Sequence, residues 1–493
     1  MQLHNLKNDI QSSVLKSVRR LTYAFVPQLP RTRIFDDPSP PSRIYPTSWL
    51  DGLRGLAALC VFNFHYLFAY GDMASKPWGD SKHRWLVELP IIRLPYLGLP
   101  MVNIFFIVAG YVISLKPLQL MHSNTSVSRE KLLQTICSSV FRRFFRLYLP
   151  VVASTMLIVI ATRLYLLEIT RGPLVDRKIF PGTREKHLER LDTLSNQLLF
   201  WCKEMARLTS VWEWKPFYPL HDQHLWTIQY EFRSSLVLYL CLILVARARI
   251  YVKLTMLLAL SFYALCSDRY EIMLYLWGSC LAQWDVIRES NPDEQTLLLV
   301  DTGKGFDEGS MVEAPSLMSQ SSNLTRAQKY LRRLFNGAAV LLCLWLLTSP
   351  TTGYKTAYGY ETLSHLIPAF WTRKEKFLPA LGSALLLWLL SHSSPASLIQ
   401  RTLTSHPAQY LGKISFSLYL MHGPVLHIYG YMVPIWVWRV VDRERVVGFC
   451  AGLGVGWICN LLVVLWVADV FNREVDGRCV KITKWIEGMC FVK

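Results

Sequence analysis

The sequence predicts an all-α, polytopic membrane protein with about ten transmembrane helices, and three observations support this fold class. Hydrophobic residues make up 52% of the 493 positions and 17 residues are tryptophan, which is more apolar than the core of a soluble protein of this size requires. Apolar windows of about 20 residues recur along the chain. The basic residues behind the net charge of +18 cluster beside these windows, as they do on the cytoplasmic flanks of membrane spans.

Residues 1–47 are predicted to form a cytoplasmic basic segment. Apolar residues recur in it at helical spacing against Lys and Arg, which is typical of a helix lying on a membrane surface and equally compatible with a basic tail. It shows no apolar core with a small-residue cleavage site, so the sequence favours the endoplasmic reticulum or a related internal membrane. The proline-rich stretch 37–46 then forms a linker, because proline cannot continue a helix.

A membrane domain is predicted over residues 48–470, followed by a tail at 471–493. We expect its spans at 48–70, 96–116, 145–167, 224–246, 250–267, 271–287, 335–350, 377–392, 411–433 and 447–470. The fifth, sixth and eighth of these are short or contain polar residues such as Gln283.

The orientation of the spans follows from basic clusters in the short loops. Such clusters come after the second span, after the fourth span and before the seventh span, so all three lie on one side if the N-terminus is cytoplasmic. With an even number of spans, the C-terminus is then cytoplasmic too. The charged loop 168–223 is predicted to be a lumenal lid, and the loop 288–334, rich in Asp, Glu, Gly and Ser, a flexible cytoplasmic insertion.

The composition disfavours several classes of protein. No nucleic-acid-binding module accompanies the positive charge, and anionic membrane lipid explains its position beside the spans better than a nucleic-acid partner does. The eleven cysteines have no C-x-x-C spacing, so neither a disulfide framework nor a structural zinc site is expected. His65 has no second ligand at metal spacing in its span, so no metal is expected there either. No internal repeat is visible, which disfavours an inverted-repeat transporter.

The first span carries an arginine and a histidine, Arg54 and His65. An ionisable residue inside a membrane span costs about 2.5–3.5 kcal/mol, so its presence indicates a functional site or a buried pair. Eleven residues correspond to about three helical turns, so both side chains lie on one face, about 16 Å apart along the axis. Asp51 is expected to cap this span or to pair with a cytoplasmic arginine.

His65 is predicted to act as a general base, because a neutral imidazole can take a proton from a hydroxyl near neutral pH. The alternative is a histidine that is hydrogen-bonded between helices. Glu231, an acid in the apolar fourth span, is the predicted partner that orients the imidazole. A structural ion pair of Glu231 with Arg233 or with another span is the other interpretation.

Two further groups of polar residues are candidates for the same site. Arg142, Arg143 and Arg146 lie where the chain enters the third span from the cytoplasm. Guanidinium groups at such a position bind lipid head groups or the phosphates of a nucleotide-containing ligand, or simply flank the membrane. The ninth span carries three polar residues at helical spacing, predicted to line the cavity or to bond neighbouring helices: Ser415, Tyr419 and His422.

Five segments in this order resemble the membrane acyltransferase-3 family. They are Asp51-Gly-Leu-Arg-Gly-Leu-Ala-Ala with His65, Ile104-Phe-Phe-Ile-Val-Ala-Gly-Tyr111, the arginine run 142–146, Leu225-Trp with Glu231, and the serine-rich run 411–422. The resemblance implies transfer of an acyl group, usually acetyl from acetyl-CoA, to a hydroxyl of a carbohydrate, a lipid or a small metabolite. It also implies that Arg54 and His65 are the family's essential arginine and histidine.

The chain's length and its C-terminal run 468–476 resemble fungal members, several of which acylate terpenoid or polyketide hydroxyls. Two positions depart from the family pattern, Gln229 and the Met421-His-Gly run, and both concern the acceptor pocket.

The resulting hypothesis is an integral membrane O-acetyltransferase of specialised metabolism, with acetyl-CoA as co-substrate and no bound cofactor. Arg54 and the three arginines before span three would hold the donor phosphates, and His65 would activate a hydroxylated small-molecule acceptor. An acyl-enzyme route through Ser415 or Cys60 stays open. The alternative functions are acetylation of a cell-wall carbohydrate or lipid, and, from other classes, a membrane transporter or proton relay, or a non-catalytic scaffold.

Overall fold

The computed structural model describes residues 44–79, 85–123, 125–183, 185–290 and 326–491, with the side chains of 326–330, 332 and 333 not described. Every regular element within these ranges is a helix, which confirms the all-α class. The surface helix predicted near the N-terminus lies outside the described residues, as does most of the predicted cytoplasmic insertion.

Each of the ten predicted spans coincides with a helix. These helices are α3 (Ser48–Leu67), α4 (Leu99–Ser123), α5 (Ser126–Arg163), α8 (Trp226–Val245), α9 (Ile250–Cys266), α10 (Tyr270–Glu289), α12 (Arg326–Leu347), α14 (Phe377–Ser391), α16 (His406–Val425) and α18 (Val446–Phe471).

By length and composition, four helical stretches among the described residues are suited to cross a membrane: Leu99–Ser123, Ser126–Arg163, Gln223–Val245 and Val446–Cys490. The remaining helices are shorter or more polar. Helix α9 has 17 residues, and α3 contains Asp51, Arg54 and His65 within its 20 residues. The structure therefore supports a membrane protein, while ten spans stays a prediction.

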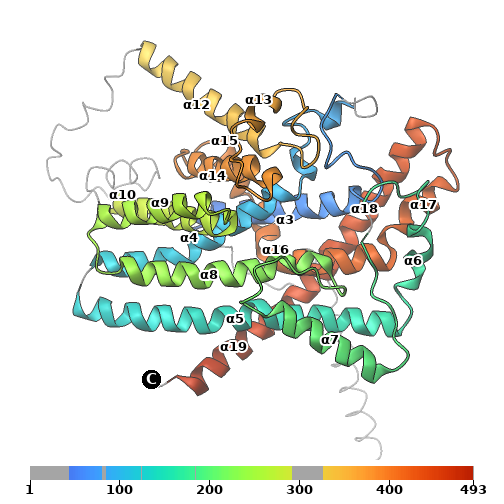
Figure 1. Ribbon diagram of the computed structural model, residues 1–493, viewed down its shortest axis with the longest axis horizontal. Helices are drawn as coiled ribbons and strands as arrows, with labels where there is room; N and C mark the ends of the chain where they lie inside the picture. Colours follow the sequence, from blue (N-terminus) through green and yellow to red (C-terminus); the bar gives the residue numbers. More distant parts are fainter. Residues whose placement is uncertain (1–43, 80–84, 124, 184, 291–325, 492–493) are drawn as a thin grey trace, which may run out of the picture. The chain divides into compact units, whose positions relative to one another are not determined.

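The chain divides into two compact units. The described parts of 73–137 and 234–394 form one of them, in which α4 packs against α10 and α14, α9 against α10, and α12 against α14 (Figure 1). Its short helices are η1 (Leu86–Glu88), η2 (Leu94–Tyr96), α13 (Glu361–Ser364) and η5 (Lys374–Lys376).

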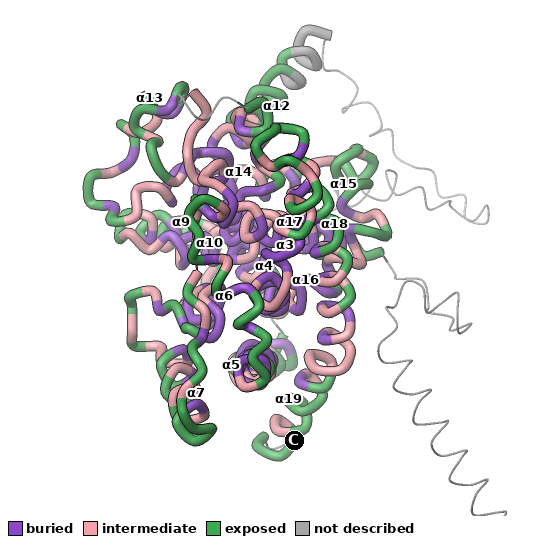
Figure 2. The backbone as a smooth tube through the Cα atoms, turned by 90° about the vertical axis from the view of Figure 1, so that its right-hand side faces the viewer, coloured by how far each residue is buried: buried purple, intermediate pink, exposed green. Residues whose placement is uncertain are grey.

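The other unit comprises the described parts of 1–72, 138–233 and 395–493, and it holds all the predicted site residues. Helix α16 packs against α3 and α18, and almost every residue of α16 from Ile414 to Val425 is buried (Figure 2). Glycine permits the close approach of α3 and α16, because a Cβ on Gly55 would overlap the backbone of Gly412.

Two π-helical turns interrupt the C-terminal part of this unit. The first, η6 (Leu426–Gly430), joins α16 to α17 (Met432–Trp438), and the second, η7 (Asn472–Asp476), joins α18 to α19 (Gly477–Cys490). Another short helix, α15 (Leu398–Leu403), precedes α16.

The predicted lid, 168–223, contains two helices, α6 (Glu168–Leu174) and α7 (Leu194–Leu208), and leads into η3 (Gln223–Leu225). Backbone hydrogen bonds fix its middle to the end of α3: Gly182 N donates to Ala69 O at 3.1 Å and Thr183 N donates to Phe68 O at 2.8 Å. This attachment holds Gly182 and Thr183 next to the end of α3, the helix whose last turn carries His65.

Candidate active site

His65 lies in the last turn of α3, and its Nδ1 atom faces two other ionisable side chains. The Nδ1 atom is 2.9 Å from His224 Nε2 and 3.6 Å from Glu185 Oε1. The backbone carbonyl of His65 accepts a hydrogen bond from the hydroxyl of Tyr431 at 3.0 Å. The other ring nitrogen, Nε2, makes no hydrogen bond to a described residue, so it is the ring nitrogen left for a substrate.

Glu185, from the lid, links three histidines. Its Oε1 atom lies 3.0 Å from His224 Nε2, and its Oε2 atom lies 2.7 Å from His427 Nε2. Burial raises the pKa of Glu185, but the charge and hydrogen bonds of His224 and His427 outweigh this effect and hold the pKa well below its usual range. Glu185 is therefore an ionised carboxylate inside the site.

His224 is held from its other side by Asp222. Asp222 caps η3 by accepting a hydrogen bond from the backbone N–H of His224 at 3.0 Å, and its Oδ1 atom also lies 2.6 Å from His224 Nδ1. Gly423 of α16 leaves room for this ring, because a Cβ there would come within 2.6 Å of His224 Nδ1. Asp222 and Glu185 therefore fix the orientation of the imidazole.

His422, on α16, completes the group of rings around His65. Its ring centroid is 5.1 Å from that of His65 and 4.5 Å from that of His224. Its Nδ1 atom lies 2.7 Å from the carbonyl oxygen of Tyr419, a pure acceptor, so Nδ1 carries the hydrogen. Its Nε2 atom is buried and has no hydrogen-bond partner among the described residues.

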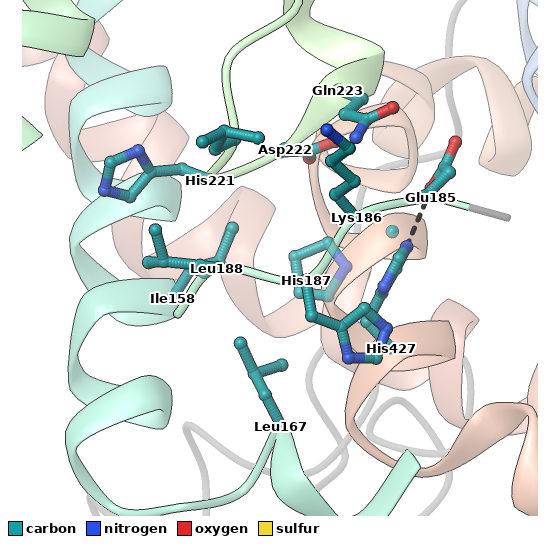
Figure 3. Close-up of a pocket in the computed structure, with 13 residues that line it drawn as sticks. Ile158, Leu167, Glu185, Lys186, His187, Leu188, His221, Asp222, Gln223 and His427 are labelled. Atoms are coloured by element: carbon teal, nitrogen blue, oxygen red, sulfur yellow. Dashed lines mark hydrogen bonds and ion pairs between the residues drawn. The ribbon is translucent and has the colours of Figure 1, made fainter. Parts of the chain in front are cut away.

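A small pocket adjoins this histidine cluster on the lid side (Figure 3). Ionisable side chains line part of it: Glu185, Lys186, His187, His221, Asp222 and His427. The rings of His187 and His427 are 4.5 Å apart. Burial, followed by the charges of His427 and Arg171, lowers the pKa of His187 to about 3, and burial lowers that of His221 to about 4. Both histidines are therefore neutral near pH 7.

The arginine end of α3 has a different set of contacts. Arg54 Nε donates to Ser415 Oγ at 2.9 Å, and Arg54 Nη2 donates to Gly412 O at 3.0 Å. Asp51, one turn earlier, lies 3.2 Å from Arg54 Nη2, so it pairs with this arginine, while Thr47 occupies the N-cap position. The side chain of Arg54 is 38% exposed. Its guanidinium is therefore accessible as well as oriented.

The arginines of α5 gather near the same end. Arg143 forms an ion pair with Glu231 at 2.7 Å. Arg142 lies 3.5 Å from Glu487. Arg146 interacts electrostatically with Arg54, Arg142, Arg143 and Asp476. Arg146 is thus close enough to Arg54 to feel its charge. The joint role of Arg54 and the span-three arginines in donor binding stays a prediction.

Comparison with known proteins assigns the chain to a family. The profile of the acyltransferase-3 family, described as an acyltransferase domain, matches residues 47–472. The chain belongs to the acyltransferase-3 family. This membership agrees with the resemblance of its five motifs and, together with the four apolar helices, indicates a membrane-bound acyltransferase.

Three similar fungal proteins align with most of this acyltransferase. The O-acetyltransferase PaAT-1 of Phomopsis amygdali is 27% identical over 452 residues, covering 90% of this chain and 84% of its own. Acyltransferase clz18 of Cochliobolus lunatus is 26% identical (88% and 95% covered), and acyltransferase R4 of a Phoma species is 27% identical (90% and 96% covered). No solved structure matches the sequence.

The structure corrects one predicted contact in this acyltransferase. Glu231 does not pair with His65 but with Arg143. The reason is its position in α8: Glu231 is seven residues beyond His224, about two helical turns or 10 Å further along. His224 thus lies at the histidine end and Glu231 at the arginine end. The catalytic roles of His65 and Glu231 remain predictions.

The three candidates on α16 divide between the two ends. Ser415 contacts Arg54, and His422 lies beside His65. Tyr419 holds the backbone at the histidine end, since its hydroxyl lies 2.6 Å from Thr227 Oγ1 and donates to the carbonyl oxygen of His224. Their shared helix face, predicted from the spacing, therefore runs along α3 from one end to the other.

Sequence reasoning missed four residues of the histidine cluster: Glu185, Asp222, His224 and His427. His224 opens the run that contains Glu231, so its position at the start of a span was a usable signal. Glu185 and Asp222 lie in a loop of mixed charge, where nothing in the sequence distinguishes them from solvated acids. No ligand spacing indicated that three histidines would converge, because they come from α3, η3 and α16.

Proposed function

We propose that this acyltransferase moves an acetyl group from acetyl-CoA to a hydroxyl of a small metabolite, such as a terpenoid or a polyketide, in specialised-metabolite biosynthesis. The observation that carries the proposal is the state of His65. Its Nδ1 atom is held among His224 and Glu185, whereas Nε2 makes no hydrogen bond to a described residue. An imidazole fixed through one nitrogen and open at the other is suited to general-base catalysis.

The proposed reaction is a direct transfer. His65 Nε2 accepts the proton of the acceptor hydroxyl while the hydroxyl oxygen forms a bond with the thioester carbonyl carbon. The C–S bond then breaks, and the sulfur of coenzyme A takes the proton back from the imidazolium. The ionised carboxylate of Glu185 stabilises that imidazolium in the interval, a role analogous to that of the aspartate in a Ser-His-Asp triad.

The donor is proposed to bind at the opposite end of α3. Arg54, Arg142, Arg143 and Arg146 supply guanidinium groups for the phosphates of acetyl-CoA, since arginine binds phosphate through charge-assisted hydrogen bonds. Arg54 and His65 are eleven positions apart, which corresponds to about 16 Å along the helix, and the flexible arm of the donor has to span this distance. Acetyl-CoA is a co-substrate in this scheme, with no resident cofactor.

The cellular setting is part of the proposal. The N- and C-termini face the cytoplasm, so the arginine end takes up cytoplasmic acetyl-CoA, and the membrane is the endoplasmic reticulum or a related internal membrane. The fungal relatives and the name of PaAT-1 support acetyl transfer in a fungal-type enzyme. Lipid surrounds the apolar helices, and no nucleic acid is involved.

The test uses membranes from a heterologous host that express the full chain. They are incubated with acetyl-CoA labelled in the acetyl group and with a panel of hydroxylated terpenoids, polyketides, cell-wall carbohydrates and lipids. We expect a labelled ester of a terpenoid or polyketide, equimolar release of coenzyme A, and neither product in His65→Ala membranes. A labelled carbohydrate or lipid instead would reassign the acceptor class. Uptake of label without any ester would contradict acyl transfer.

A further inference from the structure

Three histidine nitrogens converge beside the end of α3 with the spacing of a metal site, and a carboxylate oxygen lies next to two of them. One ring nitrogen from each of His65, His224 and His422 lies within 4.8 Å of the others. Glu185 Oε1 is 3.0 Å from His224 Nε2 and 3.6 Å from His65 Nδ1, and the two histidine nitrogens are 2.9 Å apart. In a tetrahedral zinc site with bonds of about 2.0 Å, neighbouring ligand atoms are about 3.3 Å apart.

The groups behind these donors are those that usually orient metal ligands. His422 donates its Nδ1–H to the carbonyl of Tyr419, which turns the lone pair of Nε2 inward. His224 Nδ1 lies 2.6 Å from Asp222 Oδ1, as in a carboxylate–histidine–zinc arrangement. The second oxygen of Glu185 is bound by His427 Nε2 at 2.7 Å. Three of the four donors are thus held in place by a second contact.

His422 provides the independent observation that points to a ligand. Its residue exposure is 1%, and its Nε2 atom has no hydrogen-bond partner among the described residues. A buried polar atom without a partner costs free energy, so such atoms are rare unless something binds them. Imidazole nitrogens together with a carboxylate suit zinc better than they suit calcium or magnesium, which prefer oxygen ligands.

We propose that His65 Nδ1, His224 Nε2, His422 Nε2 and Glu185 Oε1 form a site for Zn²⁺, and that zinc bound there inhibits acyl transfer. Binding displaces the hydrogen shared between His65 and His224, because a coordinating imidazole nitrogen must be deprotonated. With zinc on Nδ1, His65 carries its remaining hydrogen on Nε2 and cannot accept the proton of an acceptor. The inhibition rests on the proposed role of His65, whereas the binding of the metal does not.

Metal binding is tested directly on the full chain. The detergent-solubilised protein is stripped with EDTA, dialysed against Zn²⁺ and analysed by elemental mass spectrometry, and Co²⁺ is used as a second probe, because its visible absorption reports tetrahedral coordination. We expect one metal ion per chain. His422→Gln and Glu185→Gln should each weaken binding at least about 10-fold and remove the tetrahedral cobalt spectrum.

The matched control is His221→Gln, which removes a buried histidine of the adjoining pocket that supplies no donor atom. It should bind zinc like the unaltered chain. Thermal unfolding of each metal-free variant separates loss of a ligand from loss of the fold. Failure of the unaltered chain to bind zinc stoichiometrically, or tight binding by a folded His422→Gln variant, would overturn the site.

Inhibition is tested by adding Zn²⁺ to the acetyl-transfer assay and then removing it with EDTA. We expect the rate to fall in proportion to occupancy and to recover on chelation. An unchanged or increased rate at full occupancy would overturn the inhibitory role. If the chain transferred acetyl groups but bound no zinc, the metal site would be overturned and the proposed function would stand. If the chain bound zinc but its metal-free form transferred no acetyl group, the metal site would stand and the proposed function would be overturned.

Discussion

At the arginine end of helix α3, the side chain of Arg54 is 38% exposed, and that of its ion-pair partner, Asp51, is 56% exposed. At its histidine end, the side chains of Glu185 and His224 are only 9% and 3% exposed. An ion pair in water is screened and worth little, but an accessible guanidinium can exchange its partner for a phosphate. In the buried cluster, by contrast, each charge acts on its neighbours at close range and with little screening. We therefore expect substitutions at the first end to alter donor binding and those at the second end to alter the chemical step.

The largest effect is expected for His65→Ala. Removing a general base lowers kcat by about 100-fold to 10,000-fold, because the proton of the acceptor hydroxyl is then no longer taken up by a group positioned for it. Acetyl transfer by membranes carrying equal amounts of the variant measures this loss. The KM for acetyl-CoA should stay within about twofold, since a base that acts in the transition state contributes little to ground-state binding. Turnover close to that of the unaltered chain would remove His65 from the mechanism.

Glu185→Gln and Glu231→Gln form the sharpest pair, because both replace a carboxylate by its amide. Glu185→Gln should lower kcat by about 100-fold, since the imidazolium of His65 loses its counter-charge. Glu231→Gln should instead raise the KM for acetyl-CoA a few-fold through release of Arg143, with kcat nearly unchanged.

Steady-state kinetics of both variants in acetyl-CoA and in acceptor separate the two outcomes. If Glu231→Gln lowered kcat as strongly as Glu185→Gln does, the two ends would not have separate roles. Thermal unfolding checks that both variants keep the fold.

A smaller effect is expected for Arg54→Gln. Loss of one charge-assisted contact of about 1.5 kcal/mol raises the KM for acetyl-CoA about tenfold, and this increase should shrink at high salt. The control is Arg445→Gln, whose side chain is 83% exposed and lies 3.2 Å from Asp442. If Arg54→Gln and Arg445→Gln changed the KM for acetyl-CoA to the same extent, Arg54 would have no specific role in donor binding.

The smallest effect concerns acid stability. His187 and His221 have pKa values lowered from 6.5 to about 3 and about 4. Between these values and 6.5 the unfolded chain binds more protons, so stability is full above about pH 6.5 and falls as the pH falls toward 4. The thermal midpoint in detergent should therefore decline over that range, and His221→Gln should flatten the decline. If His221→Gln left the decline of the thermal midpoint with pH unchanged, burial of neutral His221 would not contribute to the acid sensitivity of stability.

Local patterns predicted the helices well, because each depends on a contiguous apolar window. Spacing also predicted which residues share a face within one helix, Arg54 with His65 and Ser415 with His422, but left open whether the two faces meet. The histidine cluster could not be obtained in this way. Glu185 lies next to His65 in a segment whose Gly182 and Thr183 bond through backbone atoms to the residues after α3, a tertiary contact that no periodicity records.

The assignment of Glu231 failed for a related reason. Burying an acid in an apolar span costs free energy, which is why Glu231 was selected as a candidate. Any opposite charge at the same depth can offset that free energy, so the cost alone does not identify the partner. Sequence alone did not specify that Arg143 provides that charge. The depth of Glu231 relative to His224, two turns apart on one helix, was available from the spacing and would have placed the two residues at different ends.

The π turns η6 and η7 constrain how this sequence can change over evolution. Each contains a residue that interacts with the groups at one end of α3. His427, which contacts Glu185, lies in η6, and Asp476, which interacts with Arg146, lies in η7. A π turn contains one residue more than an α turn, so deleting any residue of either segment rotates the following helix by about 100°. Tyr431 and α17 follow the first turn, and α19 follows the second. Orthologous chains should therefore vary in the identity of residues within these segments far more freely than in their number.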